Sequence, residues 1–464
     1  MTRLTEPATG AFTAVSRSGA SPNVTLGCDR IGLSDLSGAA RPAHGARSRR
    51  GARTPPERRI SSMTRMHGPR PGAAHALLAL VALVAACGGT TTHPTPTRGA
   101  TSTATVTACS GCSTSPITTA SPTSTAVPAT PAPTPIAGFE AASVTFVSSQ
   151  DGWVLGTVGG RLALARTQDG GTSWTSLTPP PTLFNGPGQA GVGSIRFANQ
   201  QDGWAYGSQL WSTHDGGTSW SQVSLPGLNS SAGVISPIEG LESAAGTVNA
   251  VYFGTSGFEI AGAPVSSNSW TVSATTVAFG AGPVPGAQLV IQGSAGWVVE
   301  NDRVVSGGAR LQSGAWSAWT APCSTANGPA TLAGSSSVDL IAACEVGLYG
   351  GSSSPTEQAY TSTNGGGAFT ALATALPAAC QGSSALASAT TSVAAAGCGG
   401  EIVASFDGGG SWGTVFTGGG NTGVTYVGFT TPTQGVAIEA SATSPLGTLL
   451  MTRDGGHTWA AVTI

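Results

Sequence analysis

One short pattern, an Asp-Gly-Gly triplet followed closely by an aromatic residue, recurs in the C-terminal two-thirds of the chain. A repeat of this kind is typical of small sheets that can bury their faces only against their neighbours, so it constrains the fold more than any other feature. The copies read TQDGGTSW at 167–174, THDGGTSW at 213–220, STNGGGAF at 362–369 (the weakest), SFDGGGSW at 405–412 and TRDGGHTW at 452–459.

The aromatic residues of these copies divide the region into seven units. Trp270 and Trp319 fall in the long interval between Trp220 and Phe369, where two degenerate copies belong. Consecutive marks lie 43 to 50 residues apart, close to the roughly 40–50 residues of a propeller blade. Each unit reads as four short strands, which in the first unit are 143–147, 152–157, 161–167 and 173–178.

We therefore predict an all-β fold over residues 139–464: a seven-bladed β-propeller of four-stranded antiparallel blades. A second repeat agrees, since GWVLG at 152–156 and GWAYG at 203–207 lie 51 residues apart. An open solenoid is the rival architecture, but a closed ring leaves only short, protected strand edges.

The chemistry of the repeat is local. The Asp carboxylate can accept backbone N–H groups within a tight turn, the glycines permit positive φ, and the aromatic ring packs from the next strand. The pattern resembles the Asp-box, or bacterial neuraminidase repeat, which implies a turn between strands three and four of each blade. The residues that carry this resemblance most clearly are Asp169, Trp174, Asp215, Trp220, Asp407, Trp412, Asp454 and Trp459.

The N-terminal third has the features of targeting and linker segments. Residues 73–86 form an apolar run that is short for a membrane span but suits a signal peptide, and Val84–Cys87 resembles the lipobox of bacterial lipoproteins. This resemblance implies a signal peptide at 63–86 and a lipid on Cys87; an ordinary secretion signal is the alternative. Residues 1–62 are expected to be disordered or to precede the true start. Residues 87–138, rich in Ser, Thr and Pro, should form a disordered tether.

The charge and the cysteines of residues 139–464 indicate which partners and which cellular compartment suit the protein. Residues 139–464 hold 6 Arg, no Lys and 17 acidic residues, which disfavours a nucleic-acid partner. Cys323 and Cys344 lie 21 residues apart, and Cys380 and Cys398 lie 18 apart, each pair spanning strands one and two of a unit. We predict disulfides within both pairs, as suits an exported protein, with free buried thiols as the alternative. The tether's Cys109 and Cys112 are interpreted as a local disulfide or idle thiols.

Catalytic patterns are weak. Sialidases of similar fold use three arginines and a Tyr–Glu pair, and their Phe-Arg-Ile-Pro motif does not occur in this sequence. Asp151 and Asp202 occupy equivalent places in successive units, which indicates turn structure. The charged stretch 300–303 is interpreted as a solvated loop. No His, Cys and acidic cluster has metal-ligand spacing, so we expect no metal and no cofactor.

The combination F-x-x-x-x-D-G-W-x-x-G with T-x-D-G-G-x-x-W, complete in units one and two, resembles the propeller of photosystem II assembly and stability factors. That resemblance implies a non-enzymatic binding or assembly module. We expect a monomeric, lipid-anchored, extracytoplasmic propeller that binds a protein or glycan at the cell surface. A secreted glycoside hydrolase or lyase is the alternative.

Ligand contact is expected on the face that carries the longest predicted connections, at 179–191, 226–246 and 345–358. We name it the long-loop face; the opposite, DGG-turn face carries the Asp-Gly-Gly turns and the strand one–two turns. Long loops on a rigid scaffold tend to hold function. The candidate binding residues there are Glu239, Glu242, Glu345, Tyr349 and Glu357.

Overall fold

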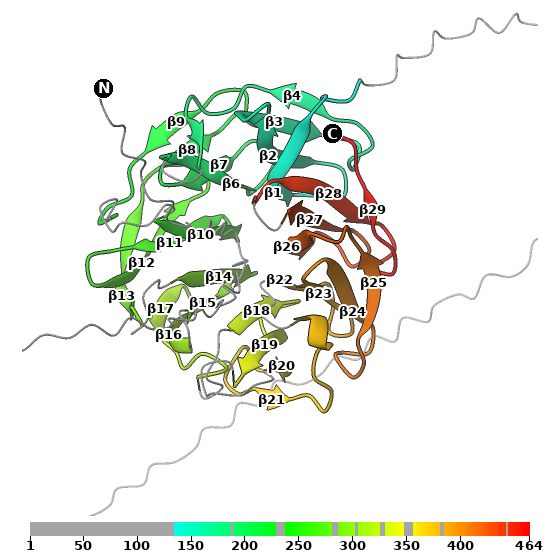
Figure 1. Ribbon diagram of the computed structural model, residues 1–464. Helices are drawn as coiled ribbons and strands as arrows, with labels where there is room; N and C mark the ends of the chain where they lie inside the picture. The colour runs from blue at the N-terminus through cyan, green and yellow to red at the C-terminus, as the bar shows by residue number, and fades with distance from the viewer. Residues whose placement is uncertain are drawn as a thin grey trace, which may run out of the picture. The chain divides into compact units, whose positions relative to one another are not determined.

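The computed structural model shows β-sheets arranged around a common axis, which confirms an all-β propeller (Figure 1). It describes residues 134–185, 189–228, 237–280, 286–301, 305–324, 330–347, 356–380, 385–441 and 444–464. The regions predicted as leader, signal peptide and most of the tether, with Cys87, Cys109 and Cys112, lie outside these residues. The helical content of the described part is one 3-10 turn, η1 (Ala378–Cys380), and no helix there is long and apolar enough to cross a membrane.

One large sheet contains strands from both ends of the described chain. Its strands are β1 (Phe139–Phe146), β2 (Gly152–Val158), β3 (Arg161–Thr167), β4 (Thr175–Leu177), β26 (Thr422–Phe429), β27 (Gly435–Ser441), β28 (Gly447–Thr452) and β29 (Ala460–Ala461). A five-stranded sheet follows in the sequence, with β5 (Leu183–Phe184), β6 (Gly191–Phe197), β7 (Gly203–Gly207), β8 (Leu210–Thr213) and β9 (Ser221–Val223).

Four further sheets have four antiparallel strands each. The first two comprise β10 (Ile238–Ala244), β11 (Thr247–Phe253), β12 (Gly257–Pro264) and β13 (Thr271–Ala278), then β14 (Ala287–Gln292), β15 (Ala295–Asn301), β16 (Val305–Gln312) and β17 (Ala315–Ala318). The last two comprise β18 (Ala330–Gly334), β19 (Leu340–Val346), β20 (Thr356–Ser362) and β21 (Thr370–Ala371), then β22 (Ala385–Ser388), β23 (Ala394–Cys398), β24 (Glu401–Ser405) and β25 (Gly413–Thr417).

The prediction of seven separate four-stranded blades is wrong. The described strands form six hydrogen-bonded sheets: five are single blades of four or five strands, and the sixth has eight strands. The eight-stranded sheet arises because β1 pairs with β28 at Ala141 and Gly447. The blade of β6–β9 gains a fifth strand because β5 pairs with β6 in parallel. Repeat spacing counts sequence units, but it cannot show which strand edges pair.

The two ends of the described chain meet in the eight-stranded sheet. The N–H of Ile136 donates a hydrogen bond to the carbonyl of Ile464 over 2.7 Å. The side chain of Ile464 is buried in the same apolar cluster as Val144 and Trp174, where Ile136 also packs. Backbone pairing and shared core therefore close the ring at this point.

The core lies between neighbouring sheets. Strand side chains alternate between the two faces of a sheet, and both faces are covered in a propeller, so the inner strands are apolar on both sides. The indole of Trp153 on β2 stacks on the ring of Phe197 on β6 at 3.8 Å, and Leu155, Leu164 and Ile195 complete that cluster. These contacts hold each sheet against the next.

Both predicted disulfides are present. Cys323 is bonded to Cys344 on β19, and Cys380 is bonded to Cys398 on β23. In each pair the first cysteine precedes strand one of its sheet and the second lies on strand two. Antiparallel pairing brings those two points together, as the sequence predicted.

Candidate functional site

The Asp-Gly-Gly turns are held by their own carboxylates. In the first copy, Oδ1 of Asp169 accepts the N–H groups of Thr172 and Ser173 at 3.0 and 2.8 Å. Gly170 and Gly171 have φ values of 70° and 83°, which residues with a Cβ rarely adopt. The carboxylate and the two glycines therefore build the turn together.

The later copies repeat this chemistry. Asp215, Asp407 and Asp454 each accept the N–H four residues onward, and Asn364 replaces the carboxylate in the weakest copy. Desolvation works against ionisation at Asp215, but the hydrogen bonds from Ser219, Thr213 and Thr218 together outweigh it and lower the pKa to about 2. These carboxylates are occupied by their own turns and are structural.

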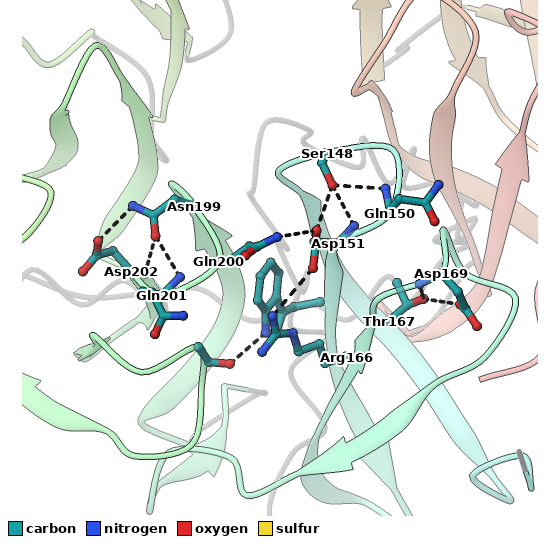
Figure 2. Close-up of polar contacts among 12 residues, drawn as sticks. Ser148, Gln150, Asp151, Arg166, Thr167, Asp169, Asn199, Gln200, Gln201 and Asp202 are labelled. Carbon is teal, nitrogen blue, oxygen red and sulfur yellow. Dashed lines mark hydrogen bonds and ion pairs between the residues drawn. The ribbon is translucent and has the colours of Figure 1, made fainter.

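A second set of polar groups links the sheets on the DGG-turn face, and Asp151 lies at its centre (Figure 2). Oδ2 of Asp151 accepts hydrogen bonds from Ser148 Oγ at 3.0 Å and from Gln200 Nε2, on the next blade, at 2.8 Å. Nη2 of Arg166 lies 3.7 Å from Oδ1. Its guanidinium carbon stands 4.8 Å above the ring of Trp153. Asp151 therefore joins two blades.

Asp202 has the equivalent place on the blade of β6–β9. It accepts a hydrogen bond from Nδ2 of Asn199 at 2.9 Å and lies 2.7 Å from Nδ1 of His214. Nε2 of His214 faces Asn268 of the following blade at 3.4 Å. Both aspartates are thus committed to turns and blade contacts, as their repetition in the sequence predicted.

An axial cavity of about 290 Å³ lies where the first strands of the sheets meet. It occupies the half of the channel next to the strand one–two turns, because its wall includes the C-terminal ends of β1, β14 and β18. Its wall combines apolar side chains, including Phe146, Ile291 and Phe429, with polar groups, and the polar atoms make up more of the cavity surface than the apolar ones. A hollow that combines apolar side chains with placed polar groups can serve as a binding site.

Arg196 and Glu242 are the charged residues in the cavity lining. Nε and Nη2 of Arg196 both lie 2.8 Å from Oε1 of Glu242, and Nη1 donates to the carbonyl of Val144 at 3.3 Å. The guanidinium also stands 5.7 Å from the ring of Tyr426. Burial opposes the charge on Arg196, but Glu242 together with Tyr426 and Tyr206 outweighs it and raises the pKa of the guanidinium above its ordinary value. This pair ties three sheets together around the axis.

Glutamines and hydroxyls join the inner strands elsewhere in the wall. Gln288 on β14 spans to β18, where its Nε2 donates to the carbonyl of Leu332 at 2.9 Å and its Oε1 accepts the Leu332 N–H at 2.8 Å. Nε2 of Gln292 donates to the carbonyl of Gly334 at 2.7 Å. Among the described lining residues Glu242 is the one carboxylate, so this part of the wall offers no second carboxylate to pair with it.

The predicted candidate residues do not converge on one site. Glu242 lines the axial cavity, whereas Glu239, Glu345 and Glu357 are buried and Tyr349 lies outside the described residues. Two predicted connections are also shorter than expected. Residues 238–244 form β10, and the connection within 345–358 runs only from the end of β19 at Val346 to the start of β20 at Thr356.

Glu345 and Glu357 are direct cross-strand partners on β19 and β20. Each is only 3% exposed, and Oε2 of each has no hydrogen-bond partner. Burial raises the pKa of both carboxyls, and the charge of Glu345 adds to the effect on Glu357. Neither residue lines the axial cavity. The described residues also contain no group of three or more His, Cys, Asp or Glu that could hold a metal.

Sequence analysis missed Arg196 as a member of a site. It is a charged residue in an otherwise apolar strand, GVGSIRF, directly before the Phe of the F-x-x-x-x-D-G-W pattern. That placement was a usable signal. Its partner Glu242 comes from the next sheet, 46 residues away, and the packing of the two sheets brings the pair together.

The sheets around one axis, their strand order and their shared core define the class of this protein as a β-propeller. Within that class, residues 135–263 match the profile of a family described as "Photosynthesis system II assembly factor YCF48". The match covers the first sheets of the propeller. None of the curated proteins compared with the chain matches it.

Three solved propellers illustrate the likeness. "YCF48 bound to D1 peptide" is 19% identical with a TM-score of 0.47, over 68% of this chain and 93% of that one. YCF48 from Cyanidioschyzon merolae is 14% identical with a TM-score of 0.45, over 68% and 96%. The GH74 xyloglucanase from Xanthomonas campestris is 14% identical with a TM-score of 0.44, over 69% and 60%.

Proposed function

We propose that this propeller is a non-enzymatic module that binds a protein partner on its DGG-turn face, with the axial cavity as the central contact. The observation that carries the proposal is the cavity itself, about 290 Å³, whose wall combines apolar side chains with polar groups and one internally paired charge couple. Such a surface can take a side chain or chain end of a partner, while Arg196 and Glu242 hold its shape. The likeness of residues 135–263 to an assembly-factor family agrees with this role.

The rival function is hydrolysis of a polysaccharide. It needs two carboxylates at about 5–10 Å on either side of a bound sugar. Glu242 is the single carboxylate among the described lining residues of the cavity, and the neighbouring carboxyls of Glu345 and Glu357 are almost fully buried. The chemistry of the described residues therefore favours binding over hydrolysis.

Photo-crosslinking from a single position tests the binding role. A benzophenone side chain replaces Ser388, at the cavity wall, in the full-length chain expressed in its native cells, and a matched chain carries it at Arg161, which is exposed at the opposite end of β3. We expect a discrete protein adduct from position 388 that is at least fivefold weaker from position 161. Equal adducts from both positions, no adduct from 388, or sugar release from a polysaccharide panel would each contradict the proposal.

We further propose that the module is extracytoplasmic and held at the membrane by a lipid on Cys87. Support comes from the apolar run 73–86 that ends at Val84-Ala85-Ala86-Cys87, and the two disulfides agree with an oxidising compartment. Metabolic labelling with an alkyne analogue of palmitate should mark the wild-type chain, and Cys87→Ala should abolish the label. Cys109→Ala is the control and should keep it; equal labelling of Cys87→Ala would refute the anchor.

A further inference from the structure

At two separate contacts between neighbouring sheets on the DGG-turn face, the same pair of side chains, a tryptophan and an arginine, fills the gap. On the eight-stranded sheet, Trp153 pairs with Arg166 across β2 and β3, and on the blade of β14–β17 Trp297 pairs with Arg310 across β15 and β16. The indole N–H of Trp153 donates to the carbonyl of Gly216 on the next blade at 3.0 Å. The indole N–H of Trp297 donates in the same way to Gly365 at 3.0 Å.

The arginine of each pair lies beside the Asp-Gly-Gly or Asn-Gly-Gly turn of the next blade. Nη2 of Arg310 donates to the carbonyl of Asn364, beside Gly365, at 3.4 Å. Arg166 lies over the indole of Trp153 and against Asp151, next to Gln200 of the following blade (Figure 2). A flat cation thus fills the gap between two adjacent sheets at both contacts.

The contact between the blades of β18–β21 and β22–β25 has the same backbone arrangement, but it has neither the tryptophan nor the arginine. The cross-strand pair at the equivalent register is Ile341 with Thr361. Gly408 corresponds to Gly216, since its N–H bonds the strand one–two turn of its own blade, at Ser392 O, as Gly216 N–H bonds Gln201 O. The side chain of Ile341 has no N–H to donate, so the Gly408 carbonyl lacks the indole hydrogen bond that Gly216 and Gly365 receive.

Asp339 corresponds to Asp151 and has no arginine opposite it. Both close the same turn: Ser336 Oγ donates to Asp339 Oδ2 at 2.8 Å, as Ser148 does to Asp151. At the register of Arg166, this blade carries the short, uncharged Thr361. The blade of β18–β21 therefore keeps a carboxylate at the place of Asp151 but has no arginine at the place of Arg166.

A cavity of about 160 Å³ lies at this contact. Asp339, Ile341, Thr361 and Gly408 line it, and the exposed Thr363 and Thr391 stand in its wall at the surface. Its remaining polar lining consists of hydroxyl groups. Ser388 lines both this cavity and the axial cavity, so the two adjoin on the DGG-turn face.

We propose that this cavity is an arginine-binding subsite, which receives the guanidinium of a partner protein in the place that Arg166 and Arg310 fill elsewhere. It rests on the proposed function in that the arginine belongs to the bound partner. A guanidinium is planar and donates from several N–H groups at once, so it can bond a carboxylate and a backbone carbonyl together. Asp339 and Gly408 offer those two acceptors, and Ile341 offers an apolar wall for the side-chain stem.

The test uses N-acetyl-arginine methylamide as the probe and ligand-observed NMR on the full-length chain. Its citrulline counterpart, which has nearly the same shape and no charge, is the matched control ligand. We expect the arginine probe to bind with a Kd in the millimolar range, as suits a single side chain, and the citrulline probe to bind at least fivefold more weakly. No saturation transfer to the arginine probe, or equal binding of the two probes, would overturn the proposal.

Two variants locate the binding. Asp339→Asn removes the charge, and Thr361→Arg supplies an internal guanidinium at the register of Arg166; each should weaken probe binding at least fivefold with an unchanged near-UV circular dichroism spectrum. Asp202→Asn, at the same turn position of another blade, should bind like the wild type. Unchanged binding by Thr361→Arg would place the probe elsewhere and overturn the subsite. Because the probe does not need the axial cavity, this result is separate from the crosslinking result.

Discussion

Replacing Trp153 with alanine should lower the free energy of unfolding by about 4 kcal/mol, since truncation of a buried tryptophan typically costs about 3–5 kcal/mol. The indole is fully buried between two sheets, with Phe197 stacked on it at 3.8 Å and the guanidinium carbon of Arg166 at 4.8 Å. Alanine would leave a cavity at the contact and remove the hydrogen bond to Gly216. Urea unfolding followed by far-UV circular dichroism measures the change.

Trp153→Phe separates the contribution of aromatic packing from that of the indole hydrogen bond. It keeps an aromatic ring against Phe197 but loses the N–H that donates to the Gly216 carbonyl. We expect a loss of about 1–2 kcal/mol, the usual cost of leaving one buried polar group unpaired together with a small packing defect. Equal losses for the two variants would mean that the hydrogen bond, rather than packing, dominates. A loss below about 1 kcal/mol for Trp153→Ala would contradict the role assigned to this contact.

Local patterns predicted much of the fold because the forces behind them are local. The Asp-Gly-Gly turns depend on a carboxylate and two glycines within a few residues, and the disulfides depend on cysteines on adjacent antiparallel strands. The number of separate sheets was not predicted correctly. It depends on a backbone pairing between Ala141 and Gly447, which are remote in sequence and carry no pairing signal in their side chains.

The candidate site was harder to predict for the same physical reason. Its residues come from the first strands of different sheets, so Arg196 meets Glu242 and Gln288 meets Leu332 only when neighbouring sheets pack together. The residues predicted for the site were mostly acidic residues near long connections, but Glu239, Glu345 and Glu357 are buried. Charge in a loop-rich segment indicated exposure, whereas β19 and β20 pair as far as Val346 and Thr356 and keep their glutamates inside.

The buried Glu345–Glu357 pair should make the protein less stable as the pH rises. The folded-state pKa of Glu357 is raised by burial and by the charge of Glu345, while an unfolded glutamate titrates near about 4.3. Below that pH both states hold the proton and the stability is fully present. Between the unfolded and the folded pKa, only the folded state holds it. Unfolding then releases a proton, and the free energy of unfolding falls by up to about 1.4 kcal/mol per pH unit.

Glu357→Gln should flatten this dependence, because an amide of nearly the same shape replaces the protonated carboxyl and cannot ionise. We expect the variant to be more stable than the wild type at pH 8, because burial and the charge of Glu345 raise the pKa of the Glu357 carboxyl in the folded state, and to show little advantage at pH 4. Urea titrations at pH 4, 5, 6, 7 and 8 measure the slope. Glu401→Gln on β24 is the matched control, since Glu401 accepts a hydrogen bond from Thr414 in an exposed pair, and it should keep the wild-type slope. Parallel slopes for the wild type and Glu357→Gln would show that Glu357 is already ionised in the folded protein, and that a cation or a polar contact compensates its charge.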